Sequence, residues 1–240
     1  MKMPNKRIAK RIVPDPERYD KWYKKPFGKY ADRLEKNLVL LFLGNAKGMK
    51  ILDVGCGTGN YCLLLAKMGA QMTGIDSSRK MISRAKEKAK RQGIQAKFHI
   101  GSAESLPFKP KSFDAVISVA ACEFFTDMGK AADEMKRVVK GNGKIVIGLI
   151  NKWSLYCSGK RLISIFKEDS VYKRAKFYSI LGLKKIFGGE VKWGSTLFAQ
   201  EWFPSWLLQL SCRFEGILSK VLKPFGAFLV LKIKPEKGIK

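Results

Sequence analysis

The chain has one histidine, few acidic residues and no closely spaced cysteines, and each shortage narrows the chemistry open to it. His99 is the only histidine among 240 residues, so a Ser-His-Asp site would depend on this single side chain. It lies within the apolar stretch AKFHI, where we expect a structural role. The five cysteines are far apart and form no CxxC pair. We therefore expect neither a disulfide framework nor a bound metal.

The chain also lacks a long apolar run. The longest, LVLLFL at residues 38–43, is far shorter than the roughly 20 residues that cross a bilayer. The N-terminus, MKMPNKRIAKRIVPDPERYD, is basic but contains no apolar core and no small-residue cleavage site typical of a secretory signal. These features predict a cytoplasmic protein without a transmembrane helix.

Negative charge is scarce as well. The chain contains 20 Asp and Glu against 47 Lys and Arg, for a formal net charge of +27. Such a charge attracts nucleic acids, anionic lipid headgroups and acidic substrates. The basic residues are spread along the whole chain, however, which a generally basic proteome would also produce. Both interpretations stay open.

Between residues 50 and 150, short β-rich runs alternate with helical stretches. The runs are ILDVG, MTGID, AKFHIG, FDAVISVA and KIVIGLI. This alternation predicts a doubly wound α/β fold, with a mostly parallel sheet and helices on both faces. We divide the chain into a helical lead-in or lid (1–44), a core (45–155), an aromatic helical cap or substrate region (156–224), and a final strand with a basic tail (225–240).

One apolar stripe stands out near the C-terminus. Between residues 204 and 222, apolar side chains recur at helical spacing: Leu207, Leu210, Phe214, Ile217, Leu218 and Val221. We expect this helix to pack its stripe on the sheet. The alternative is a membrane-binding helix.

The segment ILDVGCGTGN carries the clearest chemical signal. Its glycines are Gly55, Gly57 and Gly59, and Asn60 stands where a GxGxxG dinucleotide loop needs its third glycine. Asp53, just before the loop, would repel a pyrophosphate. S-adenosylmethionine fits better, because it has no phosphate and carries an ammonium and a sulfonium. The N-terminus of the following helix can receive its carboxylate.

The longer segment ILDVGCGTGNYCLLLAKMGAQMTGIDSSRKMISRAK resembles the first two motifs of the class I S-adenosylmethionine-dependent methyltransferases, which have a Rossmann-like fold. GSAESLPFKPKSFDAVISVAACEFF and DEMKRVVKGNGKIVIGLINKWS follow in the family's order. The branch it resembles contains the ubiquinone and menaquinone biosynthesis methyltransferases (methyltransferase type 11 domain). The resemblance covers residues 15–155 well and the remainder only loosely.

The resemblance implies a set of cofactor contacts. Asp76 would accept hydrogen bonds from both ribose hydroxyls, with a helix N-cap as its alternative role. Glu104 would accept from the adenine amino group, with a solvated loop acid as the alternative. The full set is Asp53, Gly55, Cys56, Gly57, Gly59, Asp76, Ser77, Met81, Ser102, Ala103, Glu104 and Val119.

The implied reaction is methyl transfer from S-adenosylmethionine, with S-adenosylhomocysteine as product, to a small, apolar or lipid-like acceptor. An RNA-modifying methyltransferase and a non-catalytic S-adenosylmethionine-binding protein remain as alternatives. The aromatic region and the basic charge together also suit contact with an anionic membrane surface. Nucleic acid is the less favoured partner, because no appended RNA-binding module follows the core.

The catalytic residue is not identified by the pattern. Many relatives place a histidine or another polar residue after the fourth strand, where this chain has VAACEFF, so Glu123 is the only nearby titratable candidate. Positioning alone can also drive methyl transfer to an already nucleophilic atom. Five aromatic residues are candidates for the lid or substrate site, or else for simple packing: Tyr19, Trp22, Tyr23, Trp153 and Tyr156.

Overall fold

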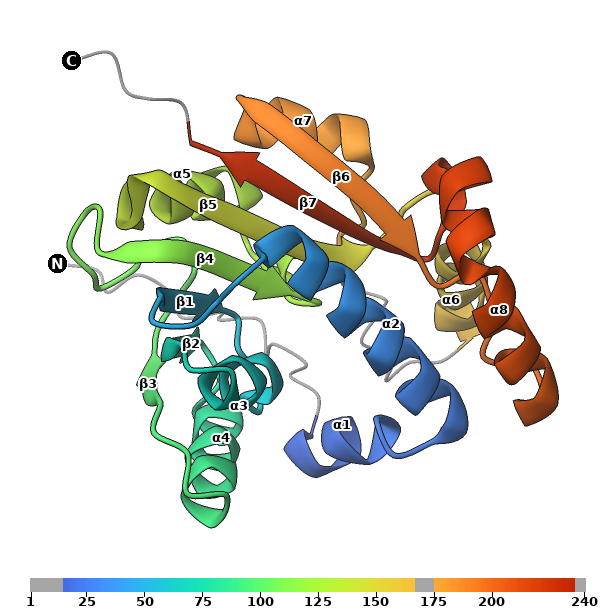
Figure 1. Cartoon of the computed structure of the whole chain (residues 1–240), viewed down its shortest axis with the longest axis horizontal. Helices are drawn as coiled ribbons and strands as arrows, with labels where there is room; N and C mark the ends of the chain where they lie inside the picture. Colours follow the sequence, from blue (N-terminus) through green and yellow to red (C-terminus); the bar gives the residue numbers. More distant parts are fainter. Residues whose placement is uncertain (1–14, 167–174, 236–240) are drawn as a thin grey trace, which may run out of the picture.

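A seven-stranded sheet forms the centre of the computed structural model, which describes residues 15–166 and 175–235 (Figure 1). The strands lie in the order β3-β2-β1-β4-β5-β7-β6. Strands β1 to β5 are parallel, and β7 runs antiparallel between β5 and β6. Their bounds are β1 (Lys50–Val54), β2 (Gln71–Asp76), β3 (Lys97–Ile100), β4 (Phe113–Val119), β5 (Val139–Ile150), β6 (Glu190–Thr196) and β7 (Phe228–Lys234). The predicted doubly wound, mostly parallel fold is confirmed; the basic tail lies outside the described residues.

Helices cover both faces of the sheet. In β1, Ile51 joins one apolar cluster and the next residue, Leu52, joins the other, as the alternation of side chains along a strand requires. The first cluster lies under α2 (Pro26–Leu43), α3 (Asn60–Lys67) and α4 (Arg79–Arg91), and the second under α5 (Met128–Val138) and α7 (Ile180–Phe187). Burial on both faces explains why the core strands are continuously apolar.

The order of the strands reverses at β1. The chain runs from β1 outward to β2 and β3, then returns to place β4 on the other side of β1. Ligands of open α/β sheets bind at such a switch point, beyond the carboxyl ends of the strands. The loops after β1, β2 and β4 meet there, and the short 3₁₀ helix η1 (Cys122–Phe124) follows β4.

The predicted helical lead-in is present as two helices. Asp15 caps α1 (Pro16–Trp22) by accepting from the backbone N–H groups of Glu17 and Arg18, both at 3.0 Å. A second proline, Pro26, begins α2, because its fixed φ suits the first helical turn. Helix α2 then crosses the sheet beside β5, β7 and β6 (Figure 1).

Residues 151–224 contain a strand that the sequence analysis did not predict. Helices α6 (Leu155–Phe166), α7 and α8 (Ser205–Val221) match the expected helical content, but β6 lies between them. In β6, Val191 and Trp193 pack against the second apolar cluster, whereas Glu190 and Lys192 lie exposed or ion-paired. This period of two is that of a half-buried edge strand. The cap is therefore a mixed region and not a purely helical one.

Both ends of this region meet at Asn151. Its N–H donates to the carbonyl of Ala227 at 2.9 Å. Its side-chain amide donates to the carbonyls of Pro224 (2.7 Å) and Gly226 (2.9 Å). Asn151 is fully buried, so these bonds tie the exit from β5 to the entry into β7.

The expected packing of the apolar stripe on the sheet is wrong. Helix α8 turns its buried side, with Leu208 and Glu215, toward the rest of the molecule, while Leu210, Phe214 and Ile217 are exposed. A buried carboxylate decides the orientation: Glu215 accepts from Tyr30 on α2 and from Thr196 at the end of β6. No helix among the described residues combines the length and the apolar character needed to cross a membrane.

Candidate active site

The loop between β1 and α3 holds its glycines in backbone conformations that other residues avoid. The φ angles of Gly55, Gly57 and Gly59 are 77°, 52° and 81°. The N–H groups of Gly55 and Cys56 donate to the carbonyl of Ile75 in β2, at 2.7 and 3.0 Å. These two bonds hold the start of the loop next to the end of β2. A Cβ at Gly57 would meet no atom within 4 Å. The loop thus presents bare backbone to open space at this glycine.

Asp76 ends β2 and faces the same loop. Its Oδ2 accepts from the N–H of Gly57 at 3.0 Å, and its Oδ1 from the N–H of Ser78 at 2.8 Å. The N-cap of α4 is Ser78, whose Oγ accepts from the N–H of Met81. The alternative N-cap role therefore belongs to Ser78. Ribose binding by Asp76 stays a prediction.

Asp53 is buried behind the glycine loop. Its Oδ2 accepts from the Cys62 thiol at 3.4 Å. Loss of hydration raises the pKa of the Asp53 carboxyl to about 7; the thiol bond opposes this rise and the nearby charge of Asp76 adds to it. A ligand cation next to these two carboxylates would favour their ionised forms. The acid before the loop thus suits a positively charged ligand.

The remaining residues predicted to contact the cofactor lie in two places. Ser77 is exposed next to Asp76, and Met81 is buried in the first turn of α4. Ala103 and Val119 are buried, Val119 at the last position of β4. Ser102 is partly exposed in the loop after β3.

Glu104 has partners of its own. Its Oε2 accepts from the hydroxyl of Ser102, and its Oε1 from the N–H groups of Thr126 (2.7 Å) and Asp127 (3.3 Å). Burial acts to raise the pKa of Glu104, but these hydrogen bonds outweigh it and lower the pKa. Glu104 therefore links the loop after β3 to the start of α5, a role the sequence did not indicate. Its contact with adenine stays a prediction.

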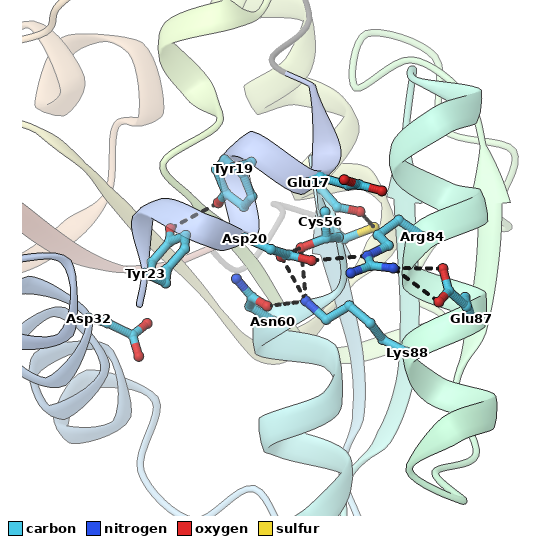
Figure 2. Close-up of polar contacts among 12 residues, drawn as sticks. Glu17, Tyr19, Asp20, Tyr23, Asp32, Cys56, Asn60, Arg84, Glu87 and Lys88 are labelled. Carbon is cyan, nitrogen blue, oxygen red and sulfur yellow. Dashed lines mark hydrogen bonds and ion pairs between the residues drawn. The ribbon is translucent and has the colours of Figure 1, made fainter. Parts of the chain in front are cut away.

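Hydrogen bonds hold helix α1 against the glycine loop through a group of polar residues that we call the Asp20 cluster: Asp20, Thr58, Asn60, Arg84 and Lys88. Figure 2 labels Asp20, Asn60, Arg84 and Lys88. Asp20 accepts from the Thr58 hydroxyl at 2.7 Å, from Lys88 at 3.0 Å and from Arg84 at 3.2 Å. Lys88 also donates to Asn60 at 2.6 Å. Although burial opposes ionisation of Asp20, these bonds hold its pKa below the usual range.

Sequence reasoning missed the Asp20 cluster. Asp20 lies 38 residues before Thr58 and 68 residues before Lys88, so no local spacing could connect them. The only available signal was an acid in the lead-in of a basic chain. The cluster places α1 directly beside Thr58, between the second and third glycines of the loop.

The aromatic lid candidates divide into three groups. The hydroxyls of Tyr19 and Tyr23 hydrogen-bond each other at 2.9 Å beside the Asp20 cluster (Figure 2). Trp22 packs edge-on against Tyr23, and Tyr156 on α6 is buried in the first apolar cluster. Trp153 is 42% exposed.

Glu123 in η1 is buried next to the carboxyl ends of β4 and β5. Its Oε1 accepts from the N–H of Ile150 at 2.7 Å, while its Oε2 is buried without a hydrogen-bond partner. Loss of hydration raises the pKa of the Glu123 carboxyl to about 7. The Tyr61 hydroxyl on α3 is likewise buried without a partner. A buried polar group without a protein partner calls for an explanation, such as a ligand, a catalytic role or an ordered water.

His99 lies away from the glycine loop. It is exposed on β3 and packs edge-on against Phe108, with ring centroids 5.4 Å apart. A broad hollow beside it is lined by residues such as Lys86, Lys97 and Gln71, at the amino ends of β1 and β2. The hollow is at the opposite end of the strands from the glycine loop, so it is not the cofactor site that the switch point predicts.

Comparison with known proteins decides the family. The model of the methyltransferase domain family matches residues 45–202. The chain belongs to the methyltransferase domain family. The match covers the glycine loop, Asp76, Glu123 and β6, and it begins after the helical lead-in.

Curated relatives cover part of this methyltransferase chain. An uncharacterized protein of Mycobacterium bovis is 36% identical over 116 residues, which are 48% of this chain and 40% of that protein. The ubiquinone biosynthesis O-methyltransferase of Bartonella bacilliformis is 28% identical over 143 residues, 58% of each chain. The chain thus spans about half the length of the curated relatives it matches.

Solved structures show the same fold over nearly the whole chain. A possible histamine N-methyltransferase of Thermotoga maritima superposes with a TM-score of 0.68 at 24% identity, covering 91% of this chain and 95% of that one. The magnesium protoporphyrin IX methyltransferase of Synechocystis, with bound S-adenosylhomocysteine, gives a TM-score of 0.64 at 18% identity, covering 90% and 92%. At these identities the likeness concerns the fold.

The residues present fit S-adenosylmethionine, the methyl donor of this family. The open space at Gly57 admits a ligand against the backbone. Two carboxylates, Asp53 and Asp76, stand where a cationic ligand would be stabilised. Helix α3 begins at Asn60, so its positive N-terminal end faces the same space.

We expect the affinity for S-adenosylmethionine to depend on pH through Asp53. With a free pKa of about 7, the carboxyl is largely protonated at lower pH and must release its proton to pair with the cationic ligand. Affinity should therefore rise as the pH increases from about 5 to about 7, by up to about tenfold per pH unit, and level off above about pH 7. Calorimetric titration across this range measures it. The Asp53→Asn variant should bind more weakly without this rise, and a wild-type affinity that is flat with pH would contradict the role of Asp53.

Proposed function

We propose that the chain is an S-adenosylmethionine-dependent methyltransferase that acts on a small, apolar or lipid-like acceptor with a hydroxyl or amine to be methylated. The supporting observation is the loop at Gly57, open to a ligand and placed between Asp76 and the covering helix α1. Twelve residues serve as the proposed cofactor contacts: Asp53, Gly55, Cys56, Gly57, Gly59, Asp76, Ser77, Met81, Ser102, Ala103, Glu104 and Val119.

Helix α1 covers the acceptor. Tyr19 and Tyr23 are joined through their hydroxyls, and burial raises the pKa of both phenols far above neutral pH. They therefore stay uncharged and present ring surface together with hydrogen-bonding capacity. An acceptor with a ring or a chain and one polar group suits this cover. Exclusion of water by the lid strengthens the electrostatic interactions within the site.

Glu123 is the proposed general base. When bound, S-adenosylmethionine supplies a methyl group on a sulfonium sulfur and leaves as S-adenosylhomocysteine. The acceptor atom that gains this methyl loses a proton, and the unpartnered Oε2 of Glu123 can take it. A pKa of about 7 suits proton uptake at neutral pH, because a general base works best when its pKa lies near the pH at which the enzyme operates.

A labelled methyl donor tests the proposal. The purified chain is incubated with radiolabelled S-adenosylmethionine and cell extract, which is then separated into organic, RNA and protein fractions. We expect label in the solvent-extractable organic fraction, because the aromatic lid suits a small acceptor. Label confined to RNA or protein would refute the small acceptor. Tight cofactor binding without label in any fraction would favour a non-catalytic binding protein.

A further inference from the structure

The outward side of α8 is a continuous apolar strip, which we call the α8 strip: Trp206, Leu210, Phe214, Ile217 and Val221. Their exposed fractions are 66, 41, 51, 60 and 72%. At about 100° per residue, these positions fall within roughly one quarter of the helix circumference. Two further exposed aromatic side chains lie close to the ends of the helix in the sequence, Trp202 (79%) and Phe225 (57%). Exposed apolar patches of this kind usually mark an interaction site.

Contacts on its buried side fix the orientation of α8, and this orientation is what exposes the strip. On the side opposite the strip, Glu215 is buried and accepts from Tyr30 (3.2 Å), Thr196 (2.6 Å) and the N–H of Leu197. Cys212 on the same side contacts Arg33 of α2. Rolling the helix to bury the strip would carry Glu215 into solvent and leave the Thr196 hydroxyl and the Leu197 N–H without their acceptor, and a buried donor without a partner is costly.

Positive charge borders the strip. Arg213 and Lys220 are exposed and lie within about 40° of its edge on the helical wheel. The single acidic residue of α8 is Glu215, which is buried on the far side. The outer side of α8 is therefore apolar at its centre and basic at its border, the pattern of a helix that lies in the interface of an anionic bilayer.

We propose that the α8 strip docks on an anionic lipid bilayer, with its apolar side chains in the headgroup boundary and Arg213 and Lys220 next to lipid phosphates. A second copy of the chain fits less well, because each copy has a net charge of +27 and the two would repel. RNA also fits less well, since Leu210, Ile217 and Val221 offer it neither charge nor a stacking surface. The docking does not depend on the proposed methyl transfer.

Vesicle sedimentation tests the docking. Wild-type protein is mixed with phosphatidylcholine vesicles, either pure or with about one third phosphatidylglycerol, a composition that gives a negative surface. We expect binding to the anionic vesicles that exceeds binding to the neutral ones by more than about tenfold. Replacing Trp206, Phe214 and Ile217 by Ser should lower the anionic partition coefficient by more than about tenfold.

Matched variants separate the strip from general charge. Met68→Ser removes an exposed apolar side chain outside the strip, 42% exposed at the end of α3, and should leave binding unchanged. Arg213→Glu with Lys220→Glu should abolish the preference for anionic vesicles, whereas Lys86→Glu with Lys90→Glu, on the exposed side of α4, should retain most of it. Equal loss in both charge pairs would show non-specific attraction and overturn the proposal.

Two further readouts keep the outcome unambiguous. Calorimetry with S-adenosylmethionine should give the same affinity for the triple Ser variant as for the wild type, which shows that the variant is folded and that loss of docking is separate from loss of the cofactor site. Analytical ultracentrifugation identifies a competing role for the strip. Wild-type vesicle binding that survives in the triple variant, or a wild-type dimer that becomes monomeric in it without any vesicle binding, would overturn the proposal.

Discussion

Asp76→Ala is expected to weaken S-adenosylmethionine binding by about 2 to 4 kcal/mol, the scale of losing charge-assisted hydrogen bonds in a partly buried site. The variant removes the proposed bonds to the ribose. It also releases the N–H of Gly57, which Asp76 holds at 3.0 Å, so the open part of the glycine loop loses its support. Isothermal calorimetry on the folded variant measures the loss.

The control is Asp114→Ala. Asp114 also accepts a backbone N–H, that of Lys50 at 2.8 Å, and pairs with Lys140, but it lies near the start of β4. This variant should bind S-adenosylmethionine as the wild type does. Asp76→Asn, which keeps one acceptor oxygen, should lie between the two. If Asp76→Ala retains full affinity while its circular dichroism is unchanged, Asp76 has no place in the cofactor site.

Glu123→Gln is expected to lower the rate of methyl transfer by about 100-fold or more, the usual contribution of a general base, while affinity for S-adenosylmethionine stays unchanged. In the wild type, the rate should rise with pH and level off above about pH 7 as the Glu123 carboxyl ionises. The Gln variant should lose this rise. Both are measured with the organic extract fraction that accepts the radiolabelled methyl group.

Glu134→Gln provides the matched comparison. Glu134 also accepts a backbone N–H, that of Leu106 at 2.7 Å, and pairs with Arg137 on α5, away from the carboxyl end of β4. It should keep the wild-type rate and pH profile. A Glu123→Gln variant with the wild-type rate would show that positioning alone suffices and that Glu123 is structural.

The sequence predicted the parts of the molecule whose signals are local. The strand from Lys50 to Val54, the glycines after it and Asp76 lie within one βαβ unit, where hydrophobic runs, turn residues and spacing all indicate the same structure. The two helices of the lead-in were also predictable, because a capping residue and two prolines mark their starts. Elements whose local signals all agree in this way can be predicted from a single sequence.

What the sequence could not predict depends on distant partners. The α8 strip looked like a core-facing stripe because periodicity identifies an apolar side but not what covers it. Glu215 decides the orientation through Tyr30, 185 residues away along the chain. Likewise β6 was hidden by its aromatic and charged residues, since an edge strand buries only one side and pairs with β7, which follows about 30 residues later. Tertiary contacts override local pattern in both cases.

The hydrogen bonds by which Asn151 joins both ends of the region between β5 and β7 have an evolutionary consequence. The exit from β5 and the entry into β7 are joined by hydrogen bonds, and the stretch between them includes β6, which pairs with β7. Loop-closure entropy grows only slowly with length, so the parts of this stretch outside β6 can lengthen or shorten while β5 and β7 keep their register. Helices α6 and α8 are thus free to diverge faster than the glycine loop. Chimeras that trade residues 152–226 between relatives would test whether this stretch sets the acceptor preference.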